Sequence, residues 1–185
     1  IVKFASAYGA WVLEKTNNPK VIIGRDARLS GEMVSGLVSA TLQGMGIHVI
    51  DLGLSTTPTV EFAVPLEKAG GGIILTASHN PIQWNALKLL NSKGEFISDE
   101  EGKSILEKAE KEDFIFAEVK KLGHYSQIDD YMDRHIQHVL DLELVDVEAI
   151  KARNFKIVVD AVNSTGGIVV PRLLRALGVE VIEEM

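Results

Sequence analysis

Three short apolar runs, separated by segments with helical spacing, constrain the fold of this chain most. The runs cover residues 20–24 (KVIIG), 47–53 (IHVIDLG) and 71–76 (GGIILT). Apolar residues recur at helical spacing before the first run and after each of the first two, at 2–13, 30–42 and 57–65. Such alternation of strands and helices predicts an α/β fold, a layered α/β/α domain with a mixed, mainly parallel sheet.

The segment after the third run has a different pattern. Residues 86–98 (ALKLLNSKGEFIS) predict an antiparallel hairpin, and Ser98 with Glu101 predicts a capping box for a helix that ends near Asp113. We expect a further helix over residues 127–142, followed by an irregular connection.

The last part of the chain predicts one strand–helix–strand unit from Phe155 onward. About 30 residues of such a unit cannot bury both faces of a parallel strand pair. We therefore expect a first domain over 1–150 and the truncated start of a second, similar α/β domain over 151–185. Because the chain opens at Ile1, already inside a helix, we also expect that an upstream segment with an N-terminal strand is missing.

Composition limits the classes of function. Hydrophobic residues make up 46% of the chain and charged residues 24%, as in a soluble globular protein. The net charge of -7 repels a nucleic-acid backbone, so nucleic acid is not an expected partner. The absence of Cys excludes thiolate metal sites and suits a cytoplasmic location. Neither a membrane span nor an export signal is recognisable.

Three polar loops follow the three predicted strands, and they define the expected site. They read GRDARLSG (24–31), GLSTTPT (53–59) and TASHNP (76–81). Thr57 and Pro58 in the loop GLSTTPT predict the N-cap and first turn of a helix. Because the carboxyl ends of parallel strands meet at one edge of a sheet, we expect the loops to form a binding edge.

The loop TASHNP places Ser78 beside His79, just before Asn80 and Pro81. One interpretation is a polar turn, since Pro disfavours a helical conformation in the residue before it. The other is that the Ser78 hydroxyl is a nucleophile. A serine hydrolase elbow is disfavoured because the flanking glycines of that motif are absent, and no phosphate-binding P-loop motif occurs in the chain.

The charged residues Arg25, Asp26 and Arg28 of the first loop are either solvated loop charges or have a structural or binding role. Asp26 is expected to pair with an arginine and shape its turn, whereas at least one of Arg25 and Arg28 is expected to bind an anion. Lys88 alternates with Leu87 and Leu89, so it faces solvent unless its strand runs back past Ser78.

Two histidines are candidate ligands for a metal ion. His135 and His138 share one face of the expected helix, but no third ligand follows at a recognisable spacing.

The segment GGIILTASHNPIQWNALKLLNSKGEFIS closely resembles the phosphoserine loop of the α-D-phosphohexomutases. The segments IIGRDARLSG, GMGIHVIDLGLSTTPT and VVDAVNSTGGIVVPRLLRALG resemble successive segments of the same family, so the resemblance covers essentially the whole chain. It implies that Ser78 is phosphorylated and gives its phosphoryl group to a hexose 1- or 6-phosphate. The resulting hexose bisphosphate then returns its other phosphate to Ser78.

The resemblance also implies roles for the other loop residues. Lys88 is the family's candidate general acid/base or electrostatic partner, and His79 holds the phosphoserine or the substrate. Arg25, Arg28 and Asn80 are expected to bind substrate or phosphate. Mg²⁺ is expected on the Ser78 phosphate, with its remaining ligands beyond Met185.

The family normally has four domains, and only the first and part of the second correspond to this chain. We therefore expect the 185 residues alone to be inactive. The parent enzyme is expected to be a phosphoglucomutase or phosphomannomutase. The segment NAL, at 85–87, also allows a phosphoglucosamine mutase. A noncatalytic sugar-phosphate-binding module that keeps the loop is the alternative from a different class. The oligomeric state stays open.

Overall fold

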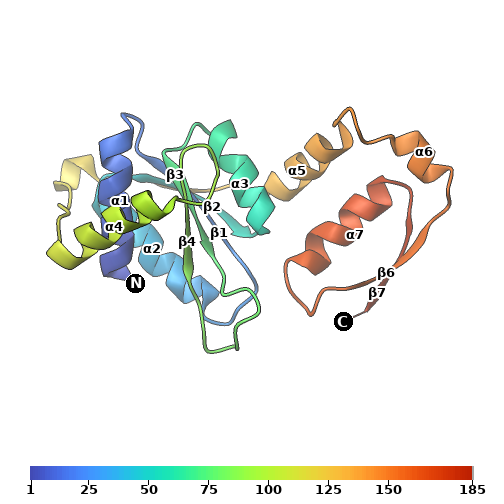
Figure 1. Cartoon of the computed structure of the whole chain (residues 1–185), viewed down its shortest axis with the longest axis horizontal. Coiled ribbons are helices and arrows are strands. Elements are labelled where there is room, and N and C mark those ends of the chain that lie inside the picture. Colours follow the sequence, from blue (N-terminus) through green and yellow to red (C-terminus); the bar gives the residue numbers. More distant parts are fainter. Residues whose placement is uncertain (185) are drawn as a thin grey trace.

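The computed structural model describes residues 1–184, and its larger part is built on one five-stranded sheet in the order β4-β3-β1-β2-β5 (Figure 1). Strand β4 runs antiparallel to β3, and the other neighbouring strands are parallel. The predicted mixed, mainly parallel sheet is therefore confirmed. The strands are β1 (Lys20–Arg25), β2 (His48–Leu54), β3 (Gly71–Leu75), β4 (Leu87–Leu90) and β5 (Tyr125–Gln127).

Helices cover both faces of this sheet. Two separate hydrophobic clusters, one on each face, contain the buried strand residues that alternate along β1, β2 and β3. One face packs against α1 (Val2–Lys15), α2 (Gly31–Gly44) and α4 (Asp99–Lys111), and the other against α3 (Thr57–Leu66) and α5 (Tyr131–Leu140).

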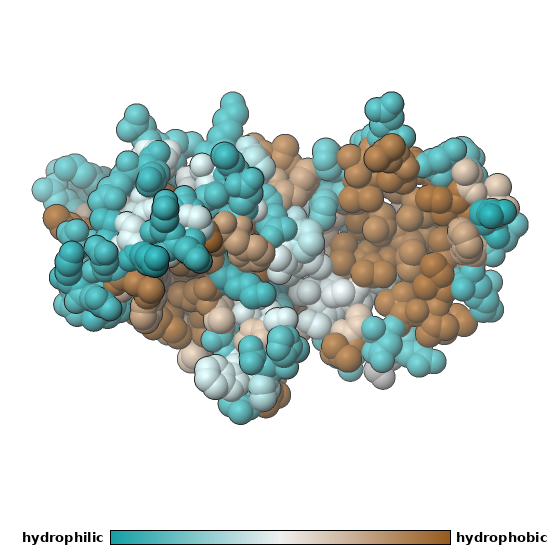
Figure 2. All heavy atoms as spheres, viewed as in Figure 1, coloured by the Kyte–Doolittle hydropathy of each residue, from teal (hydrophilic) through white to brown (hydrophobic). Residues whose placement is uncertain are grey.

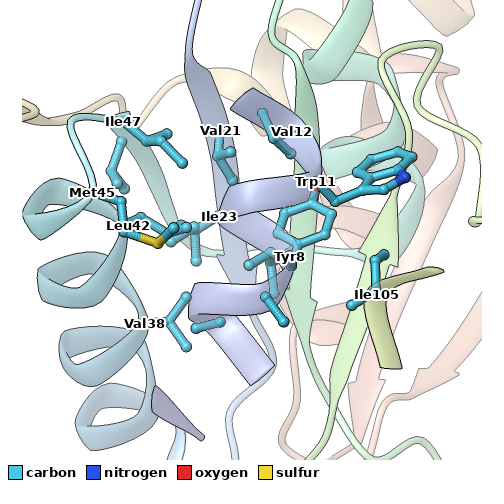
Figure 3. Close-up of a cluster of buried hydrophobic side chains, with 14 of the residues drawn as sticks. Tyr8, Trp11, Val12, Val21, Ile23, Val38, Leu42, Met45, Ile47 and Ile105 are labelled. Carbon is cyan, nitrogen blue, oxygen red and sulfur yellow. The ribbon is translucent and has the colours of Figure 1, made fainter. Parts of the chain in front are cut away.

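Gly71, the first residue of β3, makes room for Tyr8, a buried residue of α1 that stacks on Trp11 (Figure 3). A Cβ atom on Gly71 would lie 2.1 Å from the Tyr8 hydroxyl, so this position excludes any side chain. The same hydroxyl lies 3.1 Å from the Gly72 carbonyl oxygen and 2.7 Å from that of Leu90. Tyr8 thus ties α1 to the β3–β4 pair.

Several local predictions are confirmed and others need correction. The capping box of α4 is present, with Ser98 Oγ accepting from the Glu101 amide at 3.3 Å. The N-cap of α3 is Thr56 rather than Thr57, because the Thr56 hydroxyl accepts the Thr59 amide. The helix expected from Gln127 begins only at Tyr131, since residues up to Gln127 pair with β2 as β5.

The connection expected after α5 contains a short helix, α6 (Val147–Lys151), and a 3₁₀ turn, η1 (Val119–Lys121), precedes β5. The remaining elements are β6 (Lys156–Asp160), α7 (Gly166–Ala176) and β7 (Glu180–Glu184). Strands β6 and β7 form a separate two-stranded parallel sheet, which confirms the predicted strand–helix–strand unit. The division between domains at residue 150 stays a prediction.

This unit leaves much apolar surface exposed. Figure 2 shows hydrophobic side chains gathered over the part of the molecule that holds β6, α7 and β7. Exposed large apolar residues there are Phe155, Val158, Val162, Val170 and Ile182. Within residues 1–184 no helix is long and apolar enough to cross a membrane.

Candidate functional site

The three predicted loops lie at the carboxyl edge of the sheet, because β1 is parallel to both of its neighbours, β2 and β3. The Ser55 amide of GLSTTPT donates to the Arg25 carbonyl oxygen at 2.9 Å.

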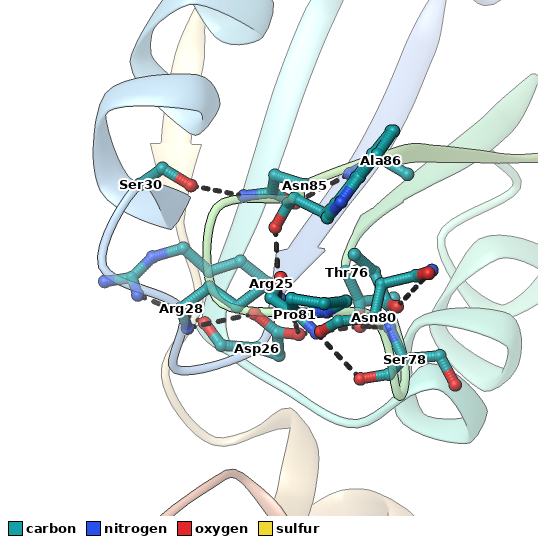
Figure 4. Close-up of polar contacts among 12 residues, drawn as sticks. Arg25, Asp26, Arg28, Ser30, Thr76, Ser78, Asn80, Pro81, Asn85 and Ala86 are labelled. Atoms are coloured by element: carbon teal, nitrogen blue, oxygen red, sulfur yellow. Dashed lines mark hydrogen bonds and ion pairs between the residues drawn. The ribbon is translucent and has the colours of Figure 1, made fainter.

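The loops after β1 and β3 surround Ser78. The first loop covers residues 26–30, after β1, and the second covers 76–86, between β3 and β4. The Asp26 amide donates to the Leu75 carbonyl oxygen at 3.1 Å, which joins the two loops where they begin. Figure 4 shows the polar contacts between them.

Ser78 is exposed at the surface of the second loop and has an unusual backbone conformation. Its φ angle is +53°, in the left-handed region that residues with a Cβ atom seldom adopt. The Ser78 amide donates to the Thr76 hydroxyl at 3.1 Å, and that hydroxyl donates to Asp26 Oδ2 at 2.7 Å. The main chain of Ser78 is thus fixed while its side chain faces solvent.

Arg28 crosses from the first loop to the second and hydrogen-bonds its main chain. Nη2 donates to the carbonyl oxygens of Ser78 and Asn80 at 2.7 and 2.8 Å. Nη1 donates to those of Pro81 and Trp84 at 3.0 and 3.1 Å (Figure 4). The sequence places Arg28 among the candidate phosphate ligands, whereas in this structure its guanidinium faces the loop backbone.

Asp26 pairs with Arg28, as the sequence predicts. Asp26 Oδ2 accepts from Arg28 Nε at 3.2 Å, and Oδ1 accepts from the Arg28 amide at 3.0 Å. The side chains are 12% exposed for Arg28 and 17% for Asp26, so the pair is largely shielded from water. Sequence reasoning missed the link from this pair to Ser78 through Thr76, since hydroxyls in turns are common and carry no distinguishing pattern.

The two remaining candidate site residues of the second loop, His79 and Asn80, are exposed. His79 lies directly beside Ser78 in the chain. The Asn80 side-chain amide donates to the Ala77 carbonyl oxygen at 2.9 Å, which closes the turn around Ser78. Both remain near Ser78, and their predicted binding roles stay predictions.

Arg25 lies on the α2 side of the sheet and lines a polar cavity of about 460 Å³ together with Ser39, Asp51 and Gln127. Its guanidinium makes one long hydrogen bond, from Nη1 to the Asp26 carbonyl oxygen at 3.5 Å. The structure thus brings Arg28, rather than Arg25, into contact with the Ser78 loop.

The buried Asp51 carboxylate in this cavity accepts from Tyr125, Ser35 and the Gly53 amide. Burial and the neighbouring Asp51 raise the pKa of Tyr125 to about 12.

Lys88 lies in β4, which runs back from the Ser78 loop alongside β3. The strand therefore has the direction that a role for Lys88 near Ser78 requires. Lys88 pairs with Ile74, and its side chain is half-buried. Glu61 of α3 lies on the same side of the sheet. Burial raises the pKa of the Glu61 carboxyl, and the nearby Lys88 ammonium partly offsets that shift.

The two histidines of α5 contribute to packing between helices. His135 Nδ1 lies 3.0 Å from Thr59 Oγ1, and both His135 and His138 contact the Phe62 ring. Among residues 1–184 no group of three His, Asp or Glu side chains is arranged to hold a metal ion. The Asp26 carboxylate next to Ser78 already accepts three hydrogen bonds. These residues alone therefore do not fit a Mg²⁺ site.

Comparison with known proteins connects this geometry to a family. The family model described as "Phosphoglucomutase/phosphomannomutase, alpha/beta/alpha domain I" matches residues 1–116. The model for domain II of the same family matches residues 130–185. The Ser78 loop, its Arg28 contacts and Lys88 all fall within the first match.

Individual relatives agree with the family models. A phosphoglucomutase/phosphomannomutase of Thermococcus kodakarensis is 36% identical over 98% of this chain and 39% of that protein. A phosphoglucosamine/phosphogalactosamine mutase of Sulfurisphaera tokodaii is 32% identical over the same shares. A crystal structure of a phosphoglucomutase/phosphomannomutase family protein from Burkholderia thailandensis superposes with a TM-score of 0.81 at 27% identity, over 99% of this chain and 39% of that one.

The chain thus spans about two fifths of the length of these relatives. The two family models together cover both of its parts, and the first alone covers more than half of its residues. The chain belongs to the phosphoglucomutase/phosphomannomutase family.

Proposed function

We propose that this chain carries the phosphoryl-transfer residue of a phosphohexomutase, which interconverts a hexose 1-phosphate and the corresponding hexose 6-phosphate. The carrying observation is the state of Ser78: an exposed hydroxyl on a main chain fixed in a left-handed conformation at the carboxyl edge of the sheet. Phosphoryl transfer depends mostly on positioning and on neutralising charge, so a rigidly held and accessible carrier suits this chemistry.

In the proposed cycle, a hydroxyl oxygen of the hexose phosphate attacks the phosphorus of phosphorylated Ser78. The bond from phosphorus to Ser78 Oγ breaks, and the sugar becomes a bisphosphate while Ser78 Oγ takes up a proton. After the bisphosphate reorients, Ser78 Oγ attacks its other phosphate and the sugar oxygen leaves with a proton. The net result moves phosphate between two positions of the sugar and restores phosphorylated Ser78.

Residues near Ser78 have proposed roles in this cycle. Lys88 is the candidate proton carrier or electrostatic partner, because its strand runs back from the Ser78 loop. His79 and Asn80 are candidates for holding the substrate, since both are exposed beside Ser78. Arg25 has a guanidinium with a single long hydrogen bond and is the candidate anion ligand.

Mg²⁺ would neutralise charge on the phosphoryl oxygens, with the Ser78 phosphate as one ligand and the others supplied from outside this chain.

Phosphoglucosamine mutase is the second candidate, because relatives at similar identity carry either name. Both candidates predict the same chemistry at Ser78 and differ only in the sugar. A noncatalytic sugar-phosphate-binding module is the alternative that keeps the loop without turnover. We also propose a cytoplasmic location, where hexose phosphates are available.

The test is phosphate mapping and mutase activity in the full-length protein. Peptide mapping should place phosphate on Ser78, and coupled assays with glucose, mannose and glucosamine phosphates should show which sugar is converted. Ser78→Ala should abolish most activity and leave the fold intact, while the exposed Ser92→Ala serves as the control. Phosphate found only on Ser55 or Ser164, or full activity of Ser78→Ala, would contradict the proposal.

A further inference from the structure

The Ser78 loop is held by one side chain that comes from a distant part of the sequence. The four carbonyl oxygens that accept from the Arg28 guanidinium belong to Ser78, Asn80, Pro81 and Trp84. All four are main-chain atoms, so these bonds fix the path of the backbone and not a particular side chain. The loop is therefore clamped along most of its length by a single residue.

We infer that Arg28 is a positioning residue for Ser78, acting together with Asp26 and Thr76; the inference rests on the proposed role of Ser78 as phosphoryl carrier. A guanidinium has five N–H groups, and Arg28 makes five side-chain hydrogen bonds. Its side chain is also only 12% exposed. Binding a phosphate would require Arg28 to release bonds that it already makes.

The hydrogen bonds form a closed ring that passes through the main chain of Ser78. The Ser78 amide donates to Thr76 Oγ1, which donates to Asp26 Oδ2, which accepts from Arg28 Nε. Arg28 Nη2 then donates to the Ser78 carbonyl oxygen at 2.7 Å. Because both the amide and the carbonyl of Ser78 are held, its φ and ψ angles are fixed together.

This ring explains how Ser78 keeps a disfavoured conformation. A left-handed φ of +53° is unfavourable for a residue with a Cβ atom, and the exposed side chain of Ser78 offers no packing to compensate. Opening the ring should let the loop relax toward ordinary backbone angles. The hydroxyl would then leave the place where an in-line transfer can occur.

The test compares Arg28→Lys with Arg153→Lys in the full-length protein. Lys keeps the charge but cannot make the forked bonds of a guanidinium, and Arg153 is an exposed arginine outside the site. In Arg28→Lys, amide hydrogen exchange over residues 78–84 should rise about tenfold or more, with β1 and β3 unchanged. The kcat should fall by about 10²-fold while KM for the hexose phosphate stays the same. Arg153→Lys should change none of these.

A second pair of variants, at Thr76, breaks the ring of hydrogen bonds on the side of the Ser78 amide. It provides an independent test if Arg28→Lys does not fold. Thr76→Val removes the hydroxyl at nearly constant volume, whereas Thr76→Ser retains it. The valine variant should show faster exchange and lower kcat, and the serine variant should restore both.

Unchanged exchange in both Arg28→Lys and Thr76→Val would overturn the inference. A raised KM with unchanged kcat and exchange in Arg28→Lys would instead make Arg28 a phosphate ligand. The exchange measurement does not need turnover, so failure of the proposed mutase function would be recognised separately by inactive wild-type protein.

Discussion

Ser78 and Lys88 are presented to the site in different ways. Ser78 has a fixed main chain and an exposed side chain, whereas Lys88 sits within a strand and is half-buried. Its neighbours Leu87 and Leu89 pack into the cluster on the α2 side, and Lys88 points to the opposite side. The strand therefore sets the direction of the ammonium group.

Replacing Lys88 by Met should affect chemistry far more than stability. Met keeps much of the aliphatic stem and deletes the charge, so packing against β3 is largely preserved. General acid–base contributions are typically about 10² to 10⁴-fold, and we expect kcat of the full-length protein to fall within that range. Coupled mutase assays and a urea midpoint should be measured together. An unchanged kcat would return Lys88 to the role of a surface lysine.

The residues of the site could be named from sequence only in part. The motif around Ser78 and the pairing of Asp26 with an arginine could both be predicted from the sequence, because they depend on neighbours in the chain. The left-handed angle of Ser78 and the contacts of Arg28 with the second loop could not. They depend on two loops that the sheet brings together, and no local pattern encodes such a meeting.

At the scale of elements, the strands with apolar runs were predictable and the short polar edge strand β5 was not. Strands β1 and β3 are almost wholly buried, so their apolar runs stand out. All three residues of β5, Tyr125–Gln127, are exposed, and only their pairing with β2 makes them a strand. A short polar edge strand has no apolar alternation from which it could be recognised.

The contact of α1 with the β3–β4 pair should depend on the Tyr8 hydroxyl. Burial raises the pKa of Tyr8, so the hydroxyl stays protonated and can donate to the carbonyl oxygens of Gly72 and Leu90. We expect Tyr8→Phe to lower the free energy of unfolding by about 0.5–1.5 kcal/mol, since it removes the buried hydroxyl that bonds these carbonyl oxygens. Chemical denaturation measures this. Tyr125→Phe is the comparison, because water can replace the half-exposed Tyr125 hydroxyl, and an equal loss in both would contradict the argument.

The packing of α5 on α3 should weaken in mild acid. Burial, and then the proximity of His138, lowers the pKa of His135 below its ordinary value of 6.5. Below pH 6.5 the unfolded chain therefore binds a proton that the folded chain does not, so stability is full above this pH and falls as the pH decreases further. Urea midpoints between pH 7.5 and about 5 should show this decline.

The control for this pH effect is His135→Gln, which removes the titrating ring and keeps a polar partner for Thr59. Its urea midpoint should depend less on pH than that of the unchanged chain. Identical pH profiles for the two proteins would assign the effect to other groups.

At the scale of the whole molecule, the two sheets differ in how well they are buried. Four of the six residues of β1 and all five of β3 are buried, whereas no residue of β6 or β7 is. The β6–β7 unit therefore depends on few apolar contacts within residues 1–184.

Amide hydrogen exchange on the chain should reveal this difference. We expect amides of β6 and β7 to exchange at least about 100-fold faster than those of β1 and β3, because local opening exposes little apolar surface. Equal protection in both sheets would show that the β6–β7 unit is stabilised by contacts that the burial pattern does not reveal.

The 185-residue chain should not convert hexose phosphates, even with Mg²⁺ and a hexose bisphosphate supplied. Residues 1–184 present the candidate carrier but no group of three ligands for a metal ion, and positioning alone can account for about 7–11 kcal/mol of a barrier. A coupled assay should compare the chain with the full-length protein at equal concentration. Comparable kcat values would show that this chain contains every residue that the reaction requires.

The hydrogen bonds from Arg28 also bear on how freely the second loop can diversify. Within that loop they reach only main-chain oxygens, and the side chains of Ile82 and Trp84 are 69% and 59% exposed. We therefore expect substitutions at Ile82, Gln83 and Trp84 to leave the backbone path of the loop unchanged. Evolution, or a randomised library, can vary the chemical character of the rim around Ser78 while the hydroxyl itself stays in one place.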